Sequence, residues 1–110
     1  MCVLPRAQEA WVPERKILRY LLNLNHTEGW SKAQFFLGQG FAEERWRILE
    51  QALRRHASTG IATFVRRQHA LDYWRVLGVL ATPSGKRPLV FSVWVVENDG
   101  APRFVSAYPR

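Results

Sequence analysis

Apolar residues recur three and four positions apart through the first half of the chain, which is the spacing of an amphipathic helix. This spacing predicts a helix over residues 13–23, since Pro13 suits the first turn of a helix. A short helix over 31–37 follows, with Ser31 as its expected N-cap. A third helix is predicted over 42–57, where apolar residues again fall on one side.

The period of the apolar residues changes to two after Gly60, which is typical of strands. The third of the predicted strands is apolar on both faces and is therefore expected near the centre of the sheet. Short turns between successive strands predict an antiparallel meander. We thus predict an α+β fold, with about three N-terminal helices followed by a four-stranded antiparallel β-meander. The predicted strands cover residues 61–67, 73–81, 89–96 and 103–108.

Length and composition indicate a single folded unit. A chain of 110 residues has the size of one domain, and a hydrophobic content of 47% is that of a protein that folds. We predict one domain over residues 1–110, in which 1–12 are loosely ordered. Residues 13–60 would form the helical half and 61–110 the sheet half.

The charge narrows the classes of partner. Sixteen basic residues against nine acidic ones give a formal net charge of +7, and all but three of the basic residues are Arg. Such a chain often binds a polyanion, because guanidinium groups bind phosphate with two hydrogen bonds and stack on bases. No apolar run has the length of a membrane span, and the N-terminus lacks the apolar segment of a signal peptide. We expect a bacterial cytoplasmic protein with no membrane partner.

Residues that could bind a metal are few and scattered. Cys2 is the only cysteine, so the sequence predicts no disulfide framework. The carboxylates are not clustered in the way that a Mg²⁺ site requires. The three histidines also lack the paired spacing of metal ligands: His26, His56 and His69. We therefore predict no metal and no cofactor.

His26 and Lys32 lie on either side of a turn that leads into the predicted helix over 31–37. Helix N-termini attract phosphate, whereas the helix dipole disfavours a lysine in the first turn, so helix stability does not explain Lys32. Both residues are therefore candidates for contacts to a phosphate group. The alternative is a solvated loop histidine and an ordinary surface lysine.

The last predicted strand carries two hydroxyl groups. Strand alternation predicts that Phe104, Ser106 and Tyr108 share one face. Ser106 and Tyr108 can bind or orient a phosphate, and the tyrosine can stack on a base or transfer a proton. The alternative is an ordinary edge strand whose tyrosine packs at the rim of the sheet.

Arginines alternate with aromatic residues in the sheet half, a pattern that suits single-stranded RNA through phosphate contacts and base stacking. The alternative is that the strand arginines simply face solvent, and Trp74 and Trp94 are expected in the core. By contrast, Arg54, Arg55 and His56 end a helix, where cations suit the dipole, and we interpret them as structural. The cluster consists of Arg66, Arg67, His69, Tyr73, Trp74 and Arg75.

Several runs of this sequence occur together in a known family. They are KILRYLLN at 16–23, GWSKAQFF at 29–36, Gly40-Phe41, and PRFVSAYP at 102–109. In this combination the chain resembles an uncharacterised family of small bacterial toxin-like proteins, over residues 14–109. Ser92 and Ser106 stand where the pattern of the family has threonine, so both positions keep a hydroxyl group.

That family is similar in layout to the toxin-module ribonucleases, which include barnase, EndoU and the RelE-like ribosome-dependent mRNA interferases. In these proteins helices precede a four-stranded antiparallel sheet. The resemblance therefore implies the same α+β ribonuclease architecture. It also implies a toxin of a bacterial toxin–antitoxin pair or of a polymorphic toxin system. The positions that match the motifs are His26, Lys32, Arg103, Ser106 and Tyr108.

These observations lead us to expect a metal-independent endoribonuclease. RNA supplies its own nucleophile, the 2′-OH, so the enzyme needs a base, an acid and positive groups near the phosphate. The expected roles are His26 as general base or acid, Lys32 as electrostatic stabiliser, and Ser106 and Tyr108 as groups that orient the phosphate or assist proton transfer. The candidates for RNA binding are Arg66, Arg67, Arg75 and Arg103.

The expected partners are RNA, either tRNA or mRNA, and an acidic antitoxin or immunity protein that covers a basic cleft. The alternative function is a non-catalytic module of the same fold that binds RNA or another protein. Geometry distinguishes the two functions. Catalysis requires His26, Lys32, Ser106 and Tyr108 to converge on one cleft.

Overall fold

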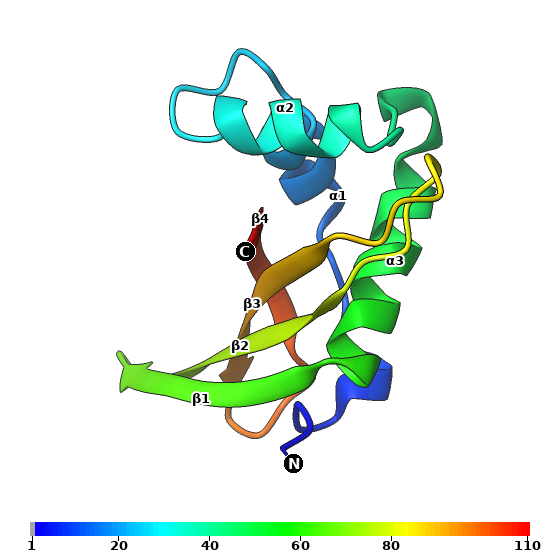
Figure 1. The fold of residues 1–110 in the computed structure, drawn as a ribbon. Coiled ribbons are helices and arrows are strands. Elements are labelled where there is room, and N and C mark those ends of the chain that lie inside the picture. Colours follow the sequence, from blue (N-terminus) through cyan, green and yellow to red (C-terminus); the bar gives the residue numbers. More distant parts are fainter. Residues whose placement is uncertain (1) are drawn as a thin grey trace.

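The structure is a computed structural model that describes residues 2–110. Helical segments occupy the first half of the chain and a four-stranded sheet the second half (Figure 1), which confirms the predicted α+β fold. The helical segments are η1 (Ala7–Glu9), α1 (Glu14–Lys16), η2 (Ile17–Leu21), α2 (Trp30–Gly38), η3 (Glu43–Arg45) and α3 (Trp46–Thr59). The strands are β1 (Ile61–Gln68), β2 (Leu71–Val79), β3 (Leu89–Glu97) and β4 (Arg103–Pro109).

The first two helices differ in detail from the prediction. The helix predicted over 13–23 is a single α-helical turn, α1, that continues as the π-helix η2. Ser31 lies inside α2 and is not its N-cap, because Gly29 precedes the first helical residue. The turn before α2 instead uses His26, whose side chain accepts the backbone N–H groups of Glu28 and Gly29. Serine is a preferred N-cap, but α2 already begins at Trp30, one residue before Ser31.

The strands pair in the order β1-β2-β3-β4, and every pair is antiparallel, so the predicted meander is confirmed. The second strand begins two residues earlier than predicted, because β1 and β2 are joined by only two residues, His69 and Ala70. Both have positive φ, as have Asn98 and Asp99 in the predicted turn between β3 and β4. Positive φ at both central residues matches the right-handed twist of hairpin strands.

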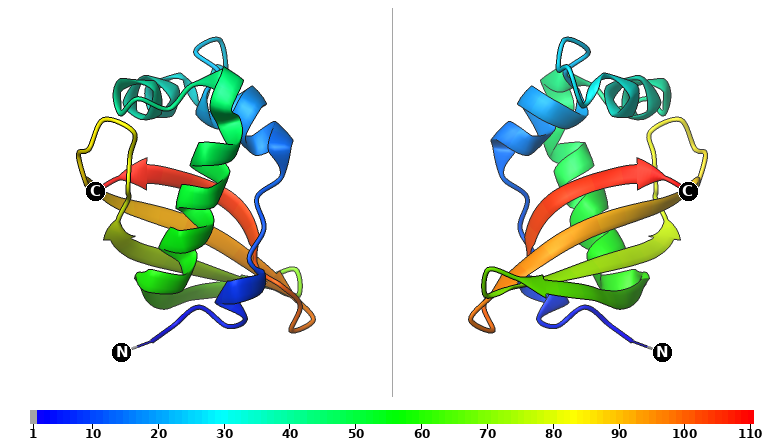
Figure 2. Two further views of the ribbon diagram at one scale, coloured as in Figure 1. Left: turned by 90° about the vertical axis from the view of Figure 1, so that its right-hand side faces the viewer. Right: turned by 90° about the vertical axis from the view of Figure 1, so that its left-hand side faces the viewer.

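One face of the sheet packs against α3 and the other has no helix across it (Figure 2). Trp94 and Val90 of β3 point towards α3 and are fully buried there with Leu49 and Leu53, as expected for a strand near the centre. The side of the sheet away from α3 is named the open face. Its main side chains are Arg66, Tyr73, Arg75, Phe91, Val93, Arg103, Ser106 and Tyr108.

A β-bulge in β4 changes which residues share a face. The register between β3 and β4 shifts at Val105, so that Phe104 pairs with Trp94 on the core side. Ser106 and Tyr108 lie on the open face instead. The prediction that Phe104, Ser106 and Tyr108 share a face was therefore wrong, because simple alternation does not allow for the extra residue of a bulge.

Residues 4–12 pack against the core, which corrects the expectation of a loose N-terminal segment for these residues. Four of their side chains are buried: Leu4, Ala7, Ala10 and Val12. The Trp11 N–H donates to the Pro102 carbonyl, and the Phe104 N–H donates to the Trp11 carbonyl, so the segment pairs with the start of β4. The expected loose segment also included Met1, which lies outside the described residues.

Candidate functional site

A surface pocket of about 370 Å³ lies between the first helical segments and β4. We name it the Tyr20 pocket. Two of the predicted catalytic residues, His26 and Ser106, are part of its wall. The full lining is Arg15, Lys16, Tyr20, His26, Glu28, Val105 and Ser106.

Tyr20 lines this pocket and contacts two of the predicted catalytic side chains. Its hydroxyl oxygen lies 3.1 Å from Ser106 Oγ, and its ring meets the His26 ring edge-on with the centroids 5.1 Å apart. The ammonium groups of Lys16 and Lys32 lie 5.4 and 5.6 Å from the centroid of the Tyr20 ring. The structure thus brings together three of the four predicted catalytic residues around a tyrosine that the sequence analysis did not select.

The turn before α2 fixes the orientation of the His26 ring. Its Nδ1 accepts the backbone N–H of Glu28 at 3.1 Å and that of Gly29 at 3.0 Å. A nitrogen that accepts two hydrogen bonds carries no proton, so the proton of the neutral ring is on Nε2. A side chain at Gly29 would bring a Cβ within 2.8 Å of a Tyr20 ring carbon, so the glycine allows the close contact. The arrangement leaves Nε2–H as the donor that His26 can offer.

Tyr108 does not line the Tyr20 pocket. It lies two residues beyond Ser106 on the open face, and its ring packs against Phe91 with the centroids 5.4 Å apart. The Arg75 guanidinium in turn lies 4.5 Å from the centroid of Phe91. Tyr108 is therefore part of an aromatic and basic row on the open face that begins beside Ser106.

The four arginines predicted to bind RNA divide between the two faces of the sheet. Arg66 lies on the open face with its guanidinium 4.3 Å from the centroid of Tyr73, and Arg103 lies on the same face. Arg67 lies on the other face and forms two hydrogen bonds with Asp72, of 2.7 and 3.1 Å. The hydrogen bond to Arg67 lowers the pKa of the Asp72 carboxyl. The structure therefore groups Arg66, Arg75 and Arg103 but not Arg67.

His56 forms a second, buried histidine cluster between α3 and the sheet. Its Nε2 lies 2.9 Å from the Val90 carbonyl oxygen and 3.1 Å from that of Gly78, so this nitrogen donates. Its Nδ1 accepts from the Ser92 hydroxyl at 2.8 Å, and Ser92 Oγ accepts the Trp94 indole N–H at 2.8 Å. Burial lowers the pKa of His56. His56 thus has a structural role, as expected. It stabilises the fold as a neutral buried group and not as a cation that interacts with the helix dipole.

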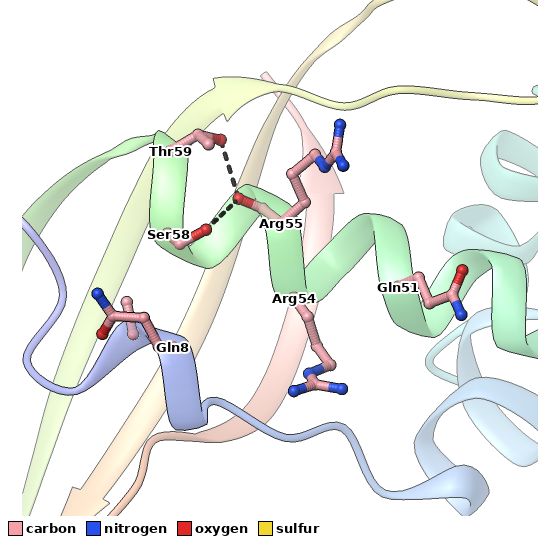
Figure 3. A pocket seen from close by; sticks show the side chains of 7 residues that line it. Gln8, Gln51, Arg54, Arg55, Ser58 and Thr59 are labelled. Carbon is pink, nitrogen blue, oxygen red and sulfur yellow. Dashed lines mark hydrogen bonds between the residues drawn. The ribbon is translucent and has the colours of Figure 1, made fainter.

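A further pocket of about 370 Å³ lies between η1 and the end of α3 (Figure 3). Arg54 Nε donates to the Ala10 carbonyl at 3.0 Å. The hydroxyls of Ser58 and Thr59 donate to the Arg55 carbonyl at 3.0 and 2.9 Å. Arg54 thus binds the N-terminal segment, which agrees with its structural interpretation, whereas the two hydroxyls bind a carbonyl of their own helix. The pocket is lined by Ala7, Gln8, Gln51, Arg54, Arg55, Ser58 and Thr59.

Within residues 2–110, no three His, Cys, Asp or Glu side chains lie close enough together to hold a metal ion. Cys2 is exposed and forms no disulfide. Across the same residues, each helix is too short or too polar to cross a membrane.

Sequence reasoning missed four polar residues of the Tyr20 pocket: Arg15, Lys16, Tyr20 and Glu28. Lys16 and Tyr20 are four positions apart and so lie on one side of a helical turn. This spacing was the available signal, but a lysine and a tyrosine on a helix are usually surface residues. Only the tertiary structure distinguishes them, because Tyr20 contacts Ser106 of β4 and Lys16 lies over the Tyr20 ring.

The chain belongs to the family described as Domain of unknown function (DUF6883), whose model matches residues 3–110. No curated protein matches the chain.

A chain of the contact-dependent growth inhibition toxin–immunity protein complex from Klebsiella pneumoniae 342 has a similar fold, with a TM-score of 0.73. The two chains are 18% identical, and the alignment covers 97% of this chain and 98% of that chain. At this identity, the likeness is one of fold.

Proposed function

We propose that this protein is a metal-independent endoribonuclease and acts as a toxin. The observation that carries the proposal is the convergence of His26, Lys32 and Ser106 around Tyr20. Cleavage of RNA through its own 2′-OH needs a proton donor, a proton acceptor and positive charge at the phosphate, and no metal. The Tyr20 pocket offers groups of each kind.

The chemistry of the pocket suggests a role for each group. Lys32, whose ammonium group lies 5.6 Å from the centroid of the Tyr20 ring, stabilises the charge that develops on the phosphate, and the Ser106 hydroxyl orients a phosphate oxygen. His26 donates a hydrogen bond from Nε2–H to a phosphate oxygen and stays neutral, since its Nδ1 is engaged by two backbone N–H groups. The Lys16 ammonium, which also lines the pocket, would protonate the leaving 5′-oxygen. Glu28 is the one carboxylate in the pocket lining and would accept the proton of the 2′-OH.

The toxin role draws on the comparisons. The chain of similar fold comes from a complex of a growth inhibition toxin and its immunity protein. The alignment covers nearly the full length of both chains. A protein with a net charge of +7 and a basic pocket would be held by an acidic immunity protein that covers the pocket. We therefore propose such an immunity protein as the physiological partner.

The experiment compares two lysines of the chain. The parent, Lys32→Ala and Lys86→Ala are incubated with total tRNA and with mRNA in EDTA, and each is expressed in bacteria to measure toxicity. Lys86 lies in the exposed β2–β3 connection and is the matched control. We expect the parent and Lys86→Ala to cleave RNA and to be toxic, and Lys32→Ala to lose both properties. No cleavage by the parent, together with undiminished toxicity of Lys32→Ala, contradicts the proposal.

The position of Tyr108 favours the second candidate function, a non-catalytic module that binds RNA. Tyr108 stacks with Phe91 outside the pocket, so base stacking suits it better than proton transfer. The same experiment separates the candidates, because a binding module would retain RNA without cleaving it.

A further inference from the structure

Two arginines of the open face lie over aromatic rings. Arg75 lies 4.5 Å from the centroid of Phe91, and Arg66 lies 4.3 Å from that of Tyr73. We propose that each guanidinium is a platform on which an unpaired base stacks, so that the substrate is single-stranded RNA. This inference rests on the proposed action on RNA and specifies which form of RNA the protein takes.

The burial of the stacked pairs supports this use. Arg66 and Arg75 are exposed, whereas Tyr73 and Phe91 are half-buried beneath them. Each guanidinium therefore has a ring on one side and remains exposed to solvent. A guanidinium plane stacks on bases, and the ring below holds it in a fixed orientation, which reduces the entropy lost when a base binds.

The charge of the two faces of the sheet supports it as well. Within residues 2–110, Arg66, Arg75 and Arg103 form no ion pair with a carboxylate. The Arg67 side chain on the other face is paired with Asp72. The open face therefore keeps positive charge available for the RNA backbone beside its stacking groups.

The open face is continuous with the Tyr20 pocket. Ser106 belongs to the pocket wall, and Tyr108 and Phe91 connect it to Arg75. Adjacent strands lie ~4.8 Å apart, so Arg75 on β2 is about 10 Å from β4. With a phosphate in the pocket, a flanking base is thus within reach of Arg75. A base can lie on this surface only when it is unpaired, because duplex RNA keeps its bases inside the helix.

The experiment measures affinity without cleavage. A short, fluorescently labelled 2′-O-methyl RNA of mixed sequence lacks the nucleophile, and it is tested alone and annealed to its complement. The variants are Arg75→Lys, which keeps the charge and loses the plane, and Arg47→Lys. Arg47 is a matched control, because its guanidinium lies 4.7 Å from the Trp46 ring centroid but on α3. Thermal melting checks that each variant is folded.

We expect the parent to bind the single strand at least about 10-fold more tightly than the duplex. Arg75→Lys should weaken single-strand binding by about 5- to 100-fold, the effect of losing a stacking group on one base, and change duplex binding little. Arg47→Lys should bind as the parent does.

Equal affinity for the two forms, or unchanged single-strand binding by Arg75→Lys, overturns the inference. If the parent still cleaves RNA in either case, the proposed function stands. Binding to neither form, with no cleavage of natural RNA, overturns both.

Discussion

The His56 network and the Tyr20 pocket use the same kinds of side chain in two different environments. Each joins a histidine, a serine hydroxyl on a strand and an aromatic side chain. In the network, Trp94 donates to Ser92, Ser92 donates to His56, and His56 donates to the Val90 carbonyl, so every polar side-chain atom has a partner. His56 and Ser92 are buried. In the pocket, the surface remains open and His26 keeps Nε2 for a ligand.

The difference shows how burial decides what a histidine can do. A buried imidazole must have its hydrogen bonds satisfied within the protein, because an unpaired buried polar group destabilises the fold by about 1–3 kcal/mol. His56 meets that requirement and has no donor or acceptor left for a substrate. At a half-exposed position, water satisfies a free nitrogen until a ligand replaces it, so His26 can bind without loss of stability.

The largest effect is expected for His26→Gln, which tests the histidine of the Tyr20 pocket. Cleavage of RNA in EDTA should fall by about 10²- to 10³-fold, the contribution of one preorganised hydrogen-bond donor to the charge that develops in the transition state. The free energy of unfolding, measured in urea, should fall by about 0.5–2 kcal/mol, because His26 accepts two backbone N–H groups before α2 and packs against Tyr20. The control is His69→Asn at the exposed β1–β2 turn, where asparagine tolerates the positive φ. Equal cleavage by His26→Gln and the parent would refute the role of His26.

A large loss of stability is expected for His56→Ala. The substitution leaves a cavity beneath α3 and removes the partner of the Ser92 hydroxyl and of two carbonyl groups. We expect the free energy of unfolding in urea to fall by about 2–5 kcal/mol. Cleavage per folded molecule should stay near that of the parent. A fully stable variant would show that the network contributes no more than a surface histidine.

The third prediction concerns pH. Because burial lowers the pKa of His56, the unfolded chain binds a proton below about pH 6.5 that the folded chain does not. The stability that neutral His56 contributes is therefore complete above about pH 6.5 and is lost as the pH falls towards the lowered pKa of the folded state. The slope is at most about 1.4 kcal/mol per pH unit for one proton.

Urea unfolding between pH 5 and 7 measures this slope, and His56→Gln is the comparison. The slope should be smaller in His56→Gln, since glutamine does not titrate. Parallel curves for the parent and the variant would mean that His56 titrates alike in the folded and unfolded states.

The smallest effect is expected at the contact between Tyr20 and Ser106. Tyr20→Phe and Ser106→Ala each remove one side of a single part-buried hydrogen bond of 3.1 Å. Each should lower the free energy of unfolding by about 0.5–1.5 kcal/mol. The double variant should cost less than the sum of the single ones, since both remove the same bond. Strict additivity in this cycle would show that the two hydroxyls do not interact.

Hydrophobic periodicity was sufficient to predict the sheet half of the fold. Its strands were located within two residues, because alternation and short turns are local properties of the chain. The errors occur where a distant segment decides the structure. The Val105 bulge changes the face of Phe104, and the pairing of Trp11 with the start of β4 orders a segment that has no clear period.

In the candidate site, too, local sequence was sufficient for some residues and contacts with distant segments decided the others. His26, Lys32 and Ser106 were selected from the chemistry of their side chains and from family motifs, and the structure brings them together. Tyr20 was not predicted as a site residue, because nothing near it in the sequence indicates a contact with Ser106, 86 residues away. Arg67 was grouped with Arg66, although adjacent strand residues point to opposite faces and Arg67 pairs with Asp72.

The sequence by itself determined the order of helices and strands, the positive charge and the types of reactive side chain. These follow from local periodicity and composition, which need no knowledge of distant contacts. Only the tertiary structure decided which histidine is buried and which is open, and that a tyrosine of η2 joins the site. Both depend on packing between segments far apart in the chain, since burial and hydrogen-bond partners are properties of the whole fold.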